Sequence, residues 1–231
     1  MREIILDTET TGLDPQTGDR LVEIGCLELL NSIPTGAVFH QYLDPQRDMP
    51  EEAFRVHGLS REFLAGKPLF ADVADEFLSF VGEDVLVIHN AEFDMRFINA
   101  ELARIGRAPL QMSRVIDTLA LARKKHPGAS NSLDALCARY KIDNSRRTKH
   151  GALLDSEILA DVYAELTGGR QTALVLQTAV VTKVVEEIKA FIGVRPEPLP
   201  SLLSPAEAEA HAALIAQMGD KALWNTYGQE S

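Results

Sequence analysis

The sequence predicts an α/β fold in which a mixed five-stranded sheet is flanked by helices and followed by a helical C-terminal extension. Two unbroken apolar runs, residues 4–6 and 85–88, are typical of strands buried on both faces. Residues 21–30 and 37–43 predict a strand meander after the first run, because turn-rich stretches separate them. A short strand at residues 115–116 completes the set, with helical patterns around it.

The first strand leads into a pair of carboxylates. Asp7 and Glu9 are two residues apart, so in an extended chain their side chains point to the same side. Hard divalent cations such as Mg²⁺ and Mn²⁺ prefer carboxylate oxygens as ligands. A pair of solvated charges at a strand end is the alternative for an Asp-x-Glu pattern taken alone, so the choice depends on further acidic positions.

A third carboxylate follows the second buried strand. Residues 50–57 and 72–81 predict helices before that strand, and Gly58 closes the first of them. After the strand, Asn90 predicts a helix N-cap, and Asp94 falls in the first turn of the new helix. The apolar face of this helix comprises Phe93, Phe97, Ile98 and Leu102. The helix dipole alone favours an acid at its start, but Asp94 also lies at the strand edge where open α/β sheets place their sites.

A charged loop lies between two further predicted helices and the helix that carries Asp155. Residues 118–125 and 132–140 predict the two helices, and residues 141–149 predict a charged loop. Arg146, Arg147 and Lys149 favour a solvated loop over a phosphate-binding one. The loop therefore has no predicted role of its own.

A histidine and a fourth carboxylate follow this loop. His150 precedes Gly151, which predicts a mobile or tightly turned segment, and Asp155 lies in a helix whose core stripe is Leu154, Ile158 and Val162. Five residues cover about 140° around a helix, so the two side chains would not share a helical face. The freedom of the loop is what would let His150 meet a water bound over Asp155. A plain surface histidine is the alternative.

Composition limits the classes of function. At 231 residues, with 45% hydrophobic and 25% charged residues, the chain is long enough for one buried domain and an appendage. A net charge of −11 has the wrong sign for gripping nucleic acid by bulk electrostatics, so any nucleic acid would be held locally with the help of cations. No apolar segment approaches the roughly 20 residues of a membrane span, and the N-terminus predicts a strand, not a signal peptide. We expect a cytoplasmic protein with Cys26 and Cys137 reduced in its core.

Three motifs carry a resemblance to a known family. They are, in chain order, Asp7-Thr-Glu-Thr-Thr-Gly12, His89-Asn-Ala-Glu-Phe-Asp94 and His150-Gly-Ala-Leu-Leu-Asp155. Their order and spacing resemble the three exonuclease motifs of the histidine subclass of the DEDD superfamily. Within it, the sequence is most similar to the epsilon proofreading subunits of bacterial DNA polymerase III. The likeness extends through residues 56–58 and 131–140 and covers residues 1–168.

The resemblance implies a fold and a set of site residues. It implies a ribonuclease H-like sheet in an exonuclease domain of residues 1–168, and two bound divalent ions, Mg²⁺ or Mn²⁺. It implies that His150 is the general base and that Glu52 and His57 contact the terminal nucleotide of the substrate. The implied metal ligands, which are also counted as catalytic, are Asp7, Glu9, Asp94 and Asp155. Asp7, Glu9 and Asp155 are also implied to contact the substrate.

The chain beyond residue 168 changes character. Apolar residues recur at helical spacing over residues 173–192, residues 195–200 predict a stiff proline-rich linker, and Ser204 with Glu207 predicts a capping box for a last helix that ends near Gly219. Packing of these helices against the nuclease domain is one alternative.

The resemblance implies partner surfaces for this tail instead. Residues 169–200 would hold a sliding-clamp contact at Gln171, Leu174 and Leu176, and residues 201–231 would dock on the alpha (polymerase) subunit of DNA polymerase III. A helix beginning at Thr172 would hide the clamp contact. A small accessory subunit on the exonuclease domain is left open, and no membrane partner is expected.

Three functions are consistent with the sequence. The preferred one is a 3′→5′ exonuclease that removes mispaired nucleotides from single-stranded DNA 3′ ends as a polymerase subunit. The second is an RNA-trimming exoribonuclease of the same superfamily, against which the long tail argues. The third is a non-catalytic adaptor between clamp and polymerase, which would not need all five catalytic positions. The motifs do not decide the sugar preference, the physiological metal or the oligomeric state.

Overall fold

The computed structural model describes residues 1–168, 203–219 and 224. The chain divides into two compact units, Met1–Ala173 and Leu174–Ser231, and the first contains the sheet. Among the described residues, no helix has the length and apolar character needed to cross a membrane.

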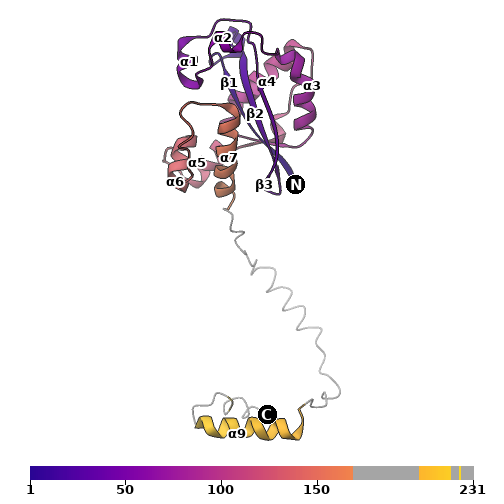
Figure 1. The fold of residues 1–231 in the computed structure, drawn as a ribbon, viewed down its shortest axis with the longest axis vertical. Coiled ribbons are helices and arrows are strands. Elements are labelled where there is room, and N and C mark those ends of the chain that lie inside the picture. The colour runs from indigo at the N-terminus through magenta and orange to yellow at the C-terminus, as the bar shows by residue number, and fades with distance from the viewer. Residues whose placement is uncertain (169–202, 220–223, 225–231) are drawn as a thin grey trace. The chain divides into compact units, whose positions relative to one another are not determined.

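The core of the first unit is a five-stranded mixed sheet (Figure 1). The strands are β1 (Arg2–Thr10), β2 (Leu21–Leu30), β3 (Ile33–Tyr42), β4 (Val85–Ile88) and β5 (Val115–Asp117), in the spatial order β3-β2-β1-β4-β5. β1 pairs antiparallel with β2 and parallel with β4, so it is the central strand. The predicted mixed five-stranded sheet is confirmed.

Helices cover both faces of this sheet (Figure 1). They are α1 (Glu51–His57), α2 (Arg61–Leu64), α3 (Phe70–Val81), α4 (Ala91–Arg104), α5 (Thr118–Lys125), α6 (Leu133–Tyr140) and α7 (Ala152–Leu166), with short 3₁₀ turns η1 (Pro15–Thr17) and η2 (Met112–Arg114). Ile4 and Leu6 of β1 pack in a cluster with residues of α3 and α4. Ile5, between them, packs with Leu159 and Tyr163 of α7. Because both faces of β1 are covered, its apolar run is continuous.

Element boundaries differ from the predicted ones in three places. β1 continues past its apolar run to Thr10, because β2 pairs with it as far as the carboxylates, with Asp7 opposite Gly25 and Glu9 opposite Glu23. β3 begins at Ile33 instead of residue 37, because left-handed residues at 31 and 32 make a tight turn directly after β2. The sequence pattern does not predict α2, which has four residues.

The predicted cap of α4 is also different. Asn90 holds the N-cap position, but its backbone is left-handed, with φ of 64°, and its side chain makes no capping hydrogen bond. Its backbone N–H instead donates to Asp117 Oδ1 at 3.1 Å. The carboxylate at the end of β5 thus fixes the turn between β4 and α4, and the Asn90 side chain is left facing a cavity.

A close backbone approach positions α7 on the sheet. A side chain on Gly25 of β2 would place its Cβ 2.3 Å from the Ala152 carbonyl carbon and from the Leu153 nitrogen. Ser156 Oγ donates to the Gly25 carbonyl at 3.0 Å. The first turn of α7, which carries Asp155, therefore lies directly on β2.

The remaining predictions concern the cysteines and the tail. Cys26 and Cys137 are free and buried, as predicted. The predicted capping box of Ser204 and Glu207 is confirmed at the start of α9 (Pro205–Met218), which ends before Gly219. Residues 173–192, the linker 195–200 and the clamp-contact candidates Gln171, Leu174 and Leu176 lie outside the described residues.

Candidate active site

Four carboxylates from three elements converge at the end of the central strand. Asp7 and Glu9 lie on β1, Asp94 lies in the first turn of α4, and Asp155 lies in the first turn of α7. Asp94 and Asp155 are each 3% exposed and Glu9 is 7% exposed, although ordinary acidic side chains stay in water. The carboxylates that the sequence predicted to share one site do share it.

Thr8 fixes one of these carboxylates. Its side chain points to the other face of β1 from Asp7 and Glu9, and its Oγ1 donates to Asp94 Oδ1 at 2.7 Å. This hydrogen bond from β1 orients the Asp94 side chain.

Crowding and burial perturb three of the four carboxyl groups. Burial, followed by the charges of Asp94 and Glu9, raises the pKa of Asp7 well above its ordinary value. Burial, followed by the charge of Asp155, raises the pKa of Glu9 to about 8. The pKa of Asp94 is raised to about 7, mainly by burial. Acidic groups held this close repel one another unless a cation lies between them, so this donor set fits hard divalent ions.

His150 lies beside this cluster on the loop before α7. Its side chain is 46% exposed, and its Nδ1 lies 3.2 Å from Asp155 Oδ2. Its backbone N–H donates to the Val56 carbonyl at 3.2 Å, which ties the loop to α1. Ligand atoms of Glu9, His150 and Asp155 all lie within 4.8 Å of one another. The loop position thus brings His150 next to Asp155, and its action on a water bound there stays a prediction.

The interpretation of Arg147 as part of a solvated loop is wrong. Its side chain is only 7% exposed, and its Nε and Nη2 donate to the two oxygens of Asp155 at 2.5 and 2.8 Å. Its Nη1 donates to Asp134 at 2.7 Å, and its Nη2 lies 2.8 Å from His150 Nδ1. Burial acts to raise the pKa of Asp155, but the contacts with His150 and Arg147 outweigh it and leave that pKa below its ordinary value. By contrast, Arg146 is exposed, as predicted.

A cavity of about 600 Å³ opens on one side of the carboxylates. Glu52 and His57 of α1 line it, together with Asp7 and Glu9, so the two predicted nucleotide contacts lie in the same cavity as the carboxylates. Leu13, which is 78% exposed, and Phe93 add apolar surface. The cavity thus combines charged groups at one end with apolar walls.

His57 is buried in the wall of this cavity. Its Nδ1 accepts a hydrogen bond from the Leu59 backbone N–H at 3.0 Å, and burial lowers its pKa. Its Nε2 is buried and has no hydrogen-bond partner in the described part of the chain. A buried polar atom without a partner is costly unless a ligand satisfies it.

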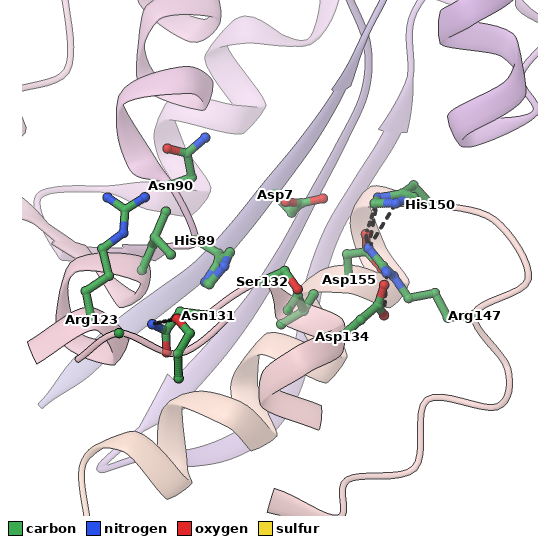
Figure 2. A pocket seen from close by; sticks show the side chains of 14 residues that line it. Asp7, His89, Asn90, Arg123, Asn131, Ser132, Asp134, Arg147, His150 and Asp155 are labelled. Atoms are coloured by element: carbon green, nitrogen blue, oxygen red, sulfur yellow. Dashed lines mark hydrogen bonds and ion pairs between the residues drawn. The ribbon is translucent and has the colours of Figure 1, made fainter. Parts of the chain in front are cut away.

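A second cavity, of about 790 Å³, extends from the same carboxylates toward α5 and α6. Figure 2 shows Arg123 and Asn131 on one side of it and Arg147 and Asp155 on the other, with Asp7 between them. The sequence pattern does not predict this cavity, because its far wall comes from loop and helix residues that belong to none of the three motifs.

The fold and the carboxylate cluster define a metal-dependent nuclease, and comparison with known proteins specifies its family. Residues 4–163 match the sequence model of the exonuclease family. DNA polymerase III subunit epsilon of Rickettsia felis is 57% identical over 176 residues, which cover 75% of this chain and 77% of that protein. The same subunit of Rickettsia prowazekii is 51% identical over 207 residues, which cover 85% of this chain and 90% of that protein.

A solved structure agrees with these sequence relatives. Exonuclease X in complex with 5′ overhanging duplex DNA has a TM-score of 0.58 and 27% identity, and the match covers 71% of this chain and 90% of that one. The chain belongs to the exonuclease family and, within it, to the DNA polymerase III epsilon subunits. It is an exonuclease, and exonucleases of this type use divalent metal ions.

Proposed function

We propose that this chain is the 3′→5′ proofreading exonuclease of a replicative DNA polymerase III, which removes mispaired nucleotides from DNA 3′ ends. The observation that carries the proposal is the convergence of four carboxylates and His150 on one edge of the sheet, beside a cavity of about 600 Å³. The identity to epsilon subunits over the whole nuclease region supports the substrate and the setting.

Two divalent ions, Mg²⁺ or Mn²⁺, complete the site in this proposal. Asp7, Glu9, Asp94 and Asp155 would hold them, and Asp7 would be central to the set because the charges of the other three carboxylates all act on it. When bound, such ions activate a water and stabilise the leaving 3′ oxygen of a phosphodiester. They would also offset the burial and the mutual repulsion that raise the pKa of Asp7 and Glu9.

His150 takes the proton of the attacking water. Imidazole is the side chain most often used as a general base, and the position of His150 on an exposed loop gives it access to water and substrate. Arg147 keeps Asp155 ionised and holds it next to the imidazole. The base and one metal ligand are thus oriented by a single guanidinium.

The terminal nucleotide occupies the cavity of about 600 Å³. Glu52 and His57 contact it from α1, and the unsatisfied Nε2 of His57 is available to one of its polar atoms. Leu13 and Phe93 offer apolar surface against which a base can stack. A frayed single-stranded end fits such a site better than a duplex end does, which favours mispaired termini.

The tail supplies the partners. A net charge of −11 argues against broad electrostatic binding of DNA, so tight and processive binding requires other subunits. Residues 201–231, which include α9, dock on the alpha subunit in this proposal, and Gln171, Leu174 and Leu176 contact the sliding clamp. A replicative role also places the protein in the cytoplasm, and a small accessory subunit remains compatible with it.

The test is metal-dependent release of mononucleotides from matched and mispaired 3′ ends of primed DNA, beside a single-stranded RNA of the same sequence. Preferential removal of the mispaired DNA terminus, lost in Asp7→Ala, would establish proofreading chemistry. Preference for RNA would move the chain to the RNA-trimming branch. Absence of release from either substrate would favour an adaptor.

A further inference from the structure

The part of the cavity of about 790 Å³ that extends toward α5 and α6 has no role in the function proposed so far. The cavity shares Asp7, His89, Asn90 and His150 with the cavity of about 600 Å³. From these shared residues the two cavities extend toward different elements, one toward α1 and the other toward α5 and α6. The carboxylate cluster therefore lies where the two cavities meet.

The topology of the substrate requires a space of this kind. The scissile phosphodiester joins the terminal nucleotide to the penultimate one, so the two nucleosides leave the reacting phosphate in different directions. If the terminal nucleotide occupies the smaller cavity, the larger cavity is the space next to Asp7 and Asp155 that is left for the penultimate one.

We propose that the larger cavity binds the penultimate nucleotide of a single-stranded 3′ end, and that Arg123 on its wall contacts the phosphodiester on the 5′ side of that nucleotide. This inference rests on the proposed function, because it takes the terminal nucleotide to lie in the smaller cavity. It assigns to Arg123 a role in binding substrate, not in the chemical step.

Charge singles out Arg123 among the residues of the wall. Two arginines line the cavity. Arg147 already forms ion pairs with Asp155 and Asp134, and its side chain is 7% exposed. Arg123, in the last turn of α5, is exposed and makes no ion pair or hydrogen bond with any described residue. In a chain with 34 acidic and 23 basic residues, a guanidinium that lines the same cavity as Asp7 and Asp155 and has no partner among the described residues is available for an anion, and phosphate suits its planar donors.

The wall around Arg123 is already held in place. Asn131 Nδ2 donates to the Ala129 carbonyl at 2.9 Å and to the His126 carbonyl at 3.3 Å, which fixes the loop before α6. His89 Nδ1 lies 2.9 Å from Thr118 Oγ1, which ties the end of β4 to the start of α5. A wall that is fixed by its own hydrogen bonds loses little entropy when a ligand binds.

The chemistry of the cavity predicts binding without sequence preference. Leu119 and Leu133 offer apolar surface to a sugar or base, and Arg123 offers charge to a phosphate. The side-chain NH2 of Asn131 is already used within the loop, and Asn90 is the other amide that lines the cavity. A proofreading enzyme must accept every penultimate base, and apolar surface with a phosphate contact suits that requirement.

The test compares two substrates that differ in the penultimate nucleotide. The p-nitrophenyl ester of thymidine 5′-phosphate contains only the terminal nucleotide and a leaving group, whereas an octamer of deoxythymidylate also fills the second cavity. We expect Arg123→Ala to raise the KM for the octamer about tenfold, with kcat nearly unchanged, and to leave both constants for the ester as they are. We also expect the slope of log KM against log salt to fall by about 0.7 for the octamer, as for one lost phosphate contact on a single strand. Arg123→Lys should restore most of the KM, because it keeps the charge.

Lys124→Ala is the matched control, since Lys124 is exposed on the same helix and does not line the cavity. An equal effect of Arg123→Ala on both substrates, no effect on either, or the same octamer effect from Lys124→Ala would overturn the inference. A wild-type chain that degrades RNA and not DNA would refute the proposed function separately. In that case the octamer of uridylate would replace the DNA octamer, and the Arg123 comparison would still decide whether the cavity binds the penultimate nucleotide.

Discussion

The guanidinium of Arg147 binds both carboxylate oxygens of Asp155, at 2.5 and 2.8 Å, while the neighbouring carboxyl of Glu9 has no such partner among the described residues. The consequence is a division of charge within one cluster. Asp155 has a lowered pKa, whereas the pKa of Glu9 is raised to about 8. One side of the site is thus held ionised by the protein itself, and the other side depends on bound cations.

Replacement of Arg147 tests this relationship. Arg147→Met leaves Asp155 buried without its bidentate partner, so we expect the free energy of unfolding to fall by about 2–3 kcal/mol. We also expect a loss of activity on the nitrophenyl ester, because Asp155 and His150 lose their common contact. Arg147→Lys should not restore the activity, since an ammonium does not bind a carboxylate in a bidentate way. Urea unfolding and ester hydrolysis are the measurements.

Arg146→Met is the matched control for this change. The Arg146 side chain is 76% exposed and, in the described part of the chain, pairs only with Glu157, at 3.2 Å. Its removal should therefore lower the free energy of unfolding by no more than about 0.5 kcal/mol. If the two variants lower the free energy of unfolding equally, the buried pair of Arg147 and Asp155 contributes no more to stability than an exposed pair, which would contradict the prediction.

The assignment of His150 as general base gives a second prediction. His150→Ala should lower kcat by a factor of about 10²–10⁴, which is typical for the loss of a positioned base. Binding of Mn²⁺, measured by calorimetry, should change much less, because the four carboxylates remain. Asp7→Ala should reduce both activity and metal binding. If His150→Ala kept the kcat of the parent enzyme, the assignment of His150 as general base would be wrong.

Most of the fold could be predicted because its strands carry strong local patterns. The runs at Ile4–Leu6 and 86–88 are buried on both faces and therefore wholly apolar. The start of β3 could not be predicted, because residues 33–38 are exposed and show no alternation. Neither could α2, because four residues are too short for a helical period.

Some residues of the candidate site could likewise be predicted from the sequence, and others could not. Its carboxylates lie in motifs at strand and helix ends, where spacing and order are visible in the sequence. Arg147 could not be predicted, because its partners are set by the packing of α7 on β2, not by its own neighbours. Arg123 was also missed, since it lies at the end of α5 with no motif around it. Whether either residue acts as proposed stays a prediction.

The raised pKa of Glu9 predicts how the stability of the metal-free protein changes with pH. An unfolded glutamate has a pKa near 4.3, so between pH 4.3 and 8 the folded state holds a proton that the unfolded state has lost. Stability therefore falls as pH rises through this range. Burial lowers the pKa of His57 and His89, which acts in the opposite direction but only below about pH 6.5.

The window from pH 7 to 8.5 isolates this carboxylate effect. In the presence of a chelator, the free energy of unfolding should fall by about 1 kcal/mol across the window, and less so with saturating Mn²⁺. Glu9→Gln should reduce the fall, whereas Glu52→Gln, an exposed position on the same cavity, should not. Urea unfolding at the two pH values is the measurement, and an unchanged fall in Glu9→Gln would contradict the prediction.

The approach of α7 to β2 gives the last prediction. Gly25→Ala would bring a Cβ within 2.3 Å of the α7 backbone at Ala152 and Leu153. The nearest atoms are all backbone atoms, so no flexible side chain can move aside. The helix must shift away from the sheet, and Asp155 must move with it. We therefore expect the free energy of unfolding to fall by about 2 kcal/mol or more, as is typical of an overpacked core, together with weaker Mn²⁺ binding.

Gly151→Ala is the contrasting change. Gly151 has an extended backbone, with φ of −161°, and the atom nearest to an added Cβ would be Glu23 Oε2, at 4.0 Å. Its free energy of unfolding should stay within about 0.5 kcal/mol of the parent. Equal tolerance at both positions would mean that the contact between α7 and β2 does not set the position of Asp155, and urea unfolding with Mn²⁺ calorimetry on the two variants decides between these outcomes.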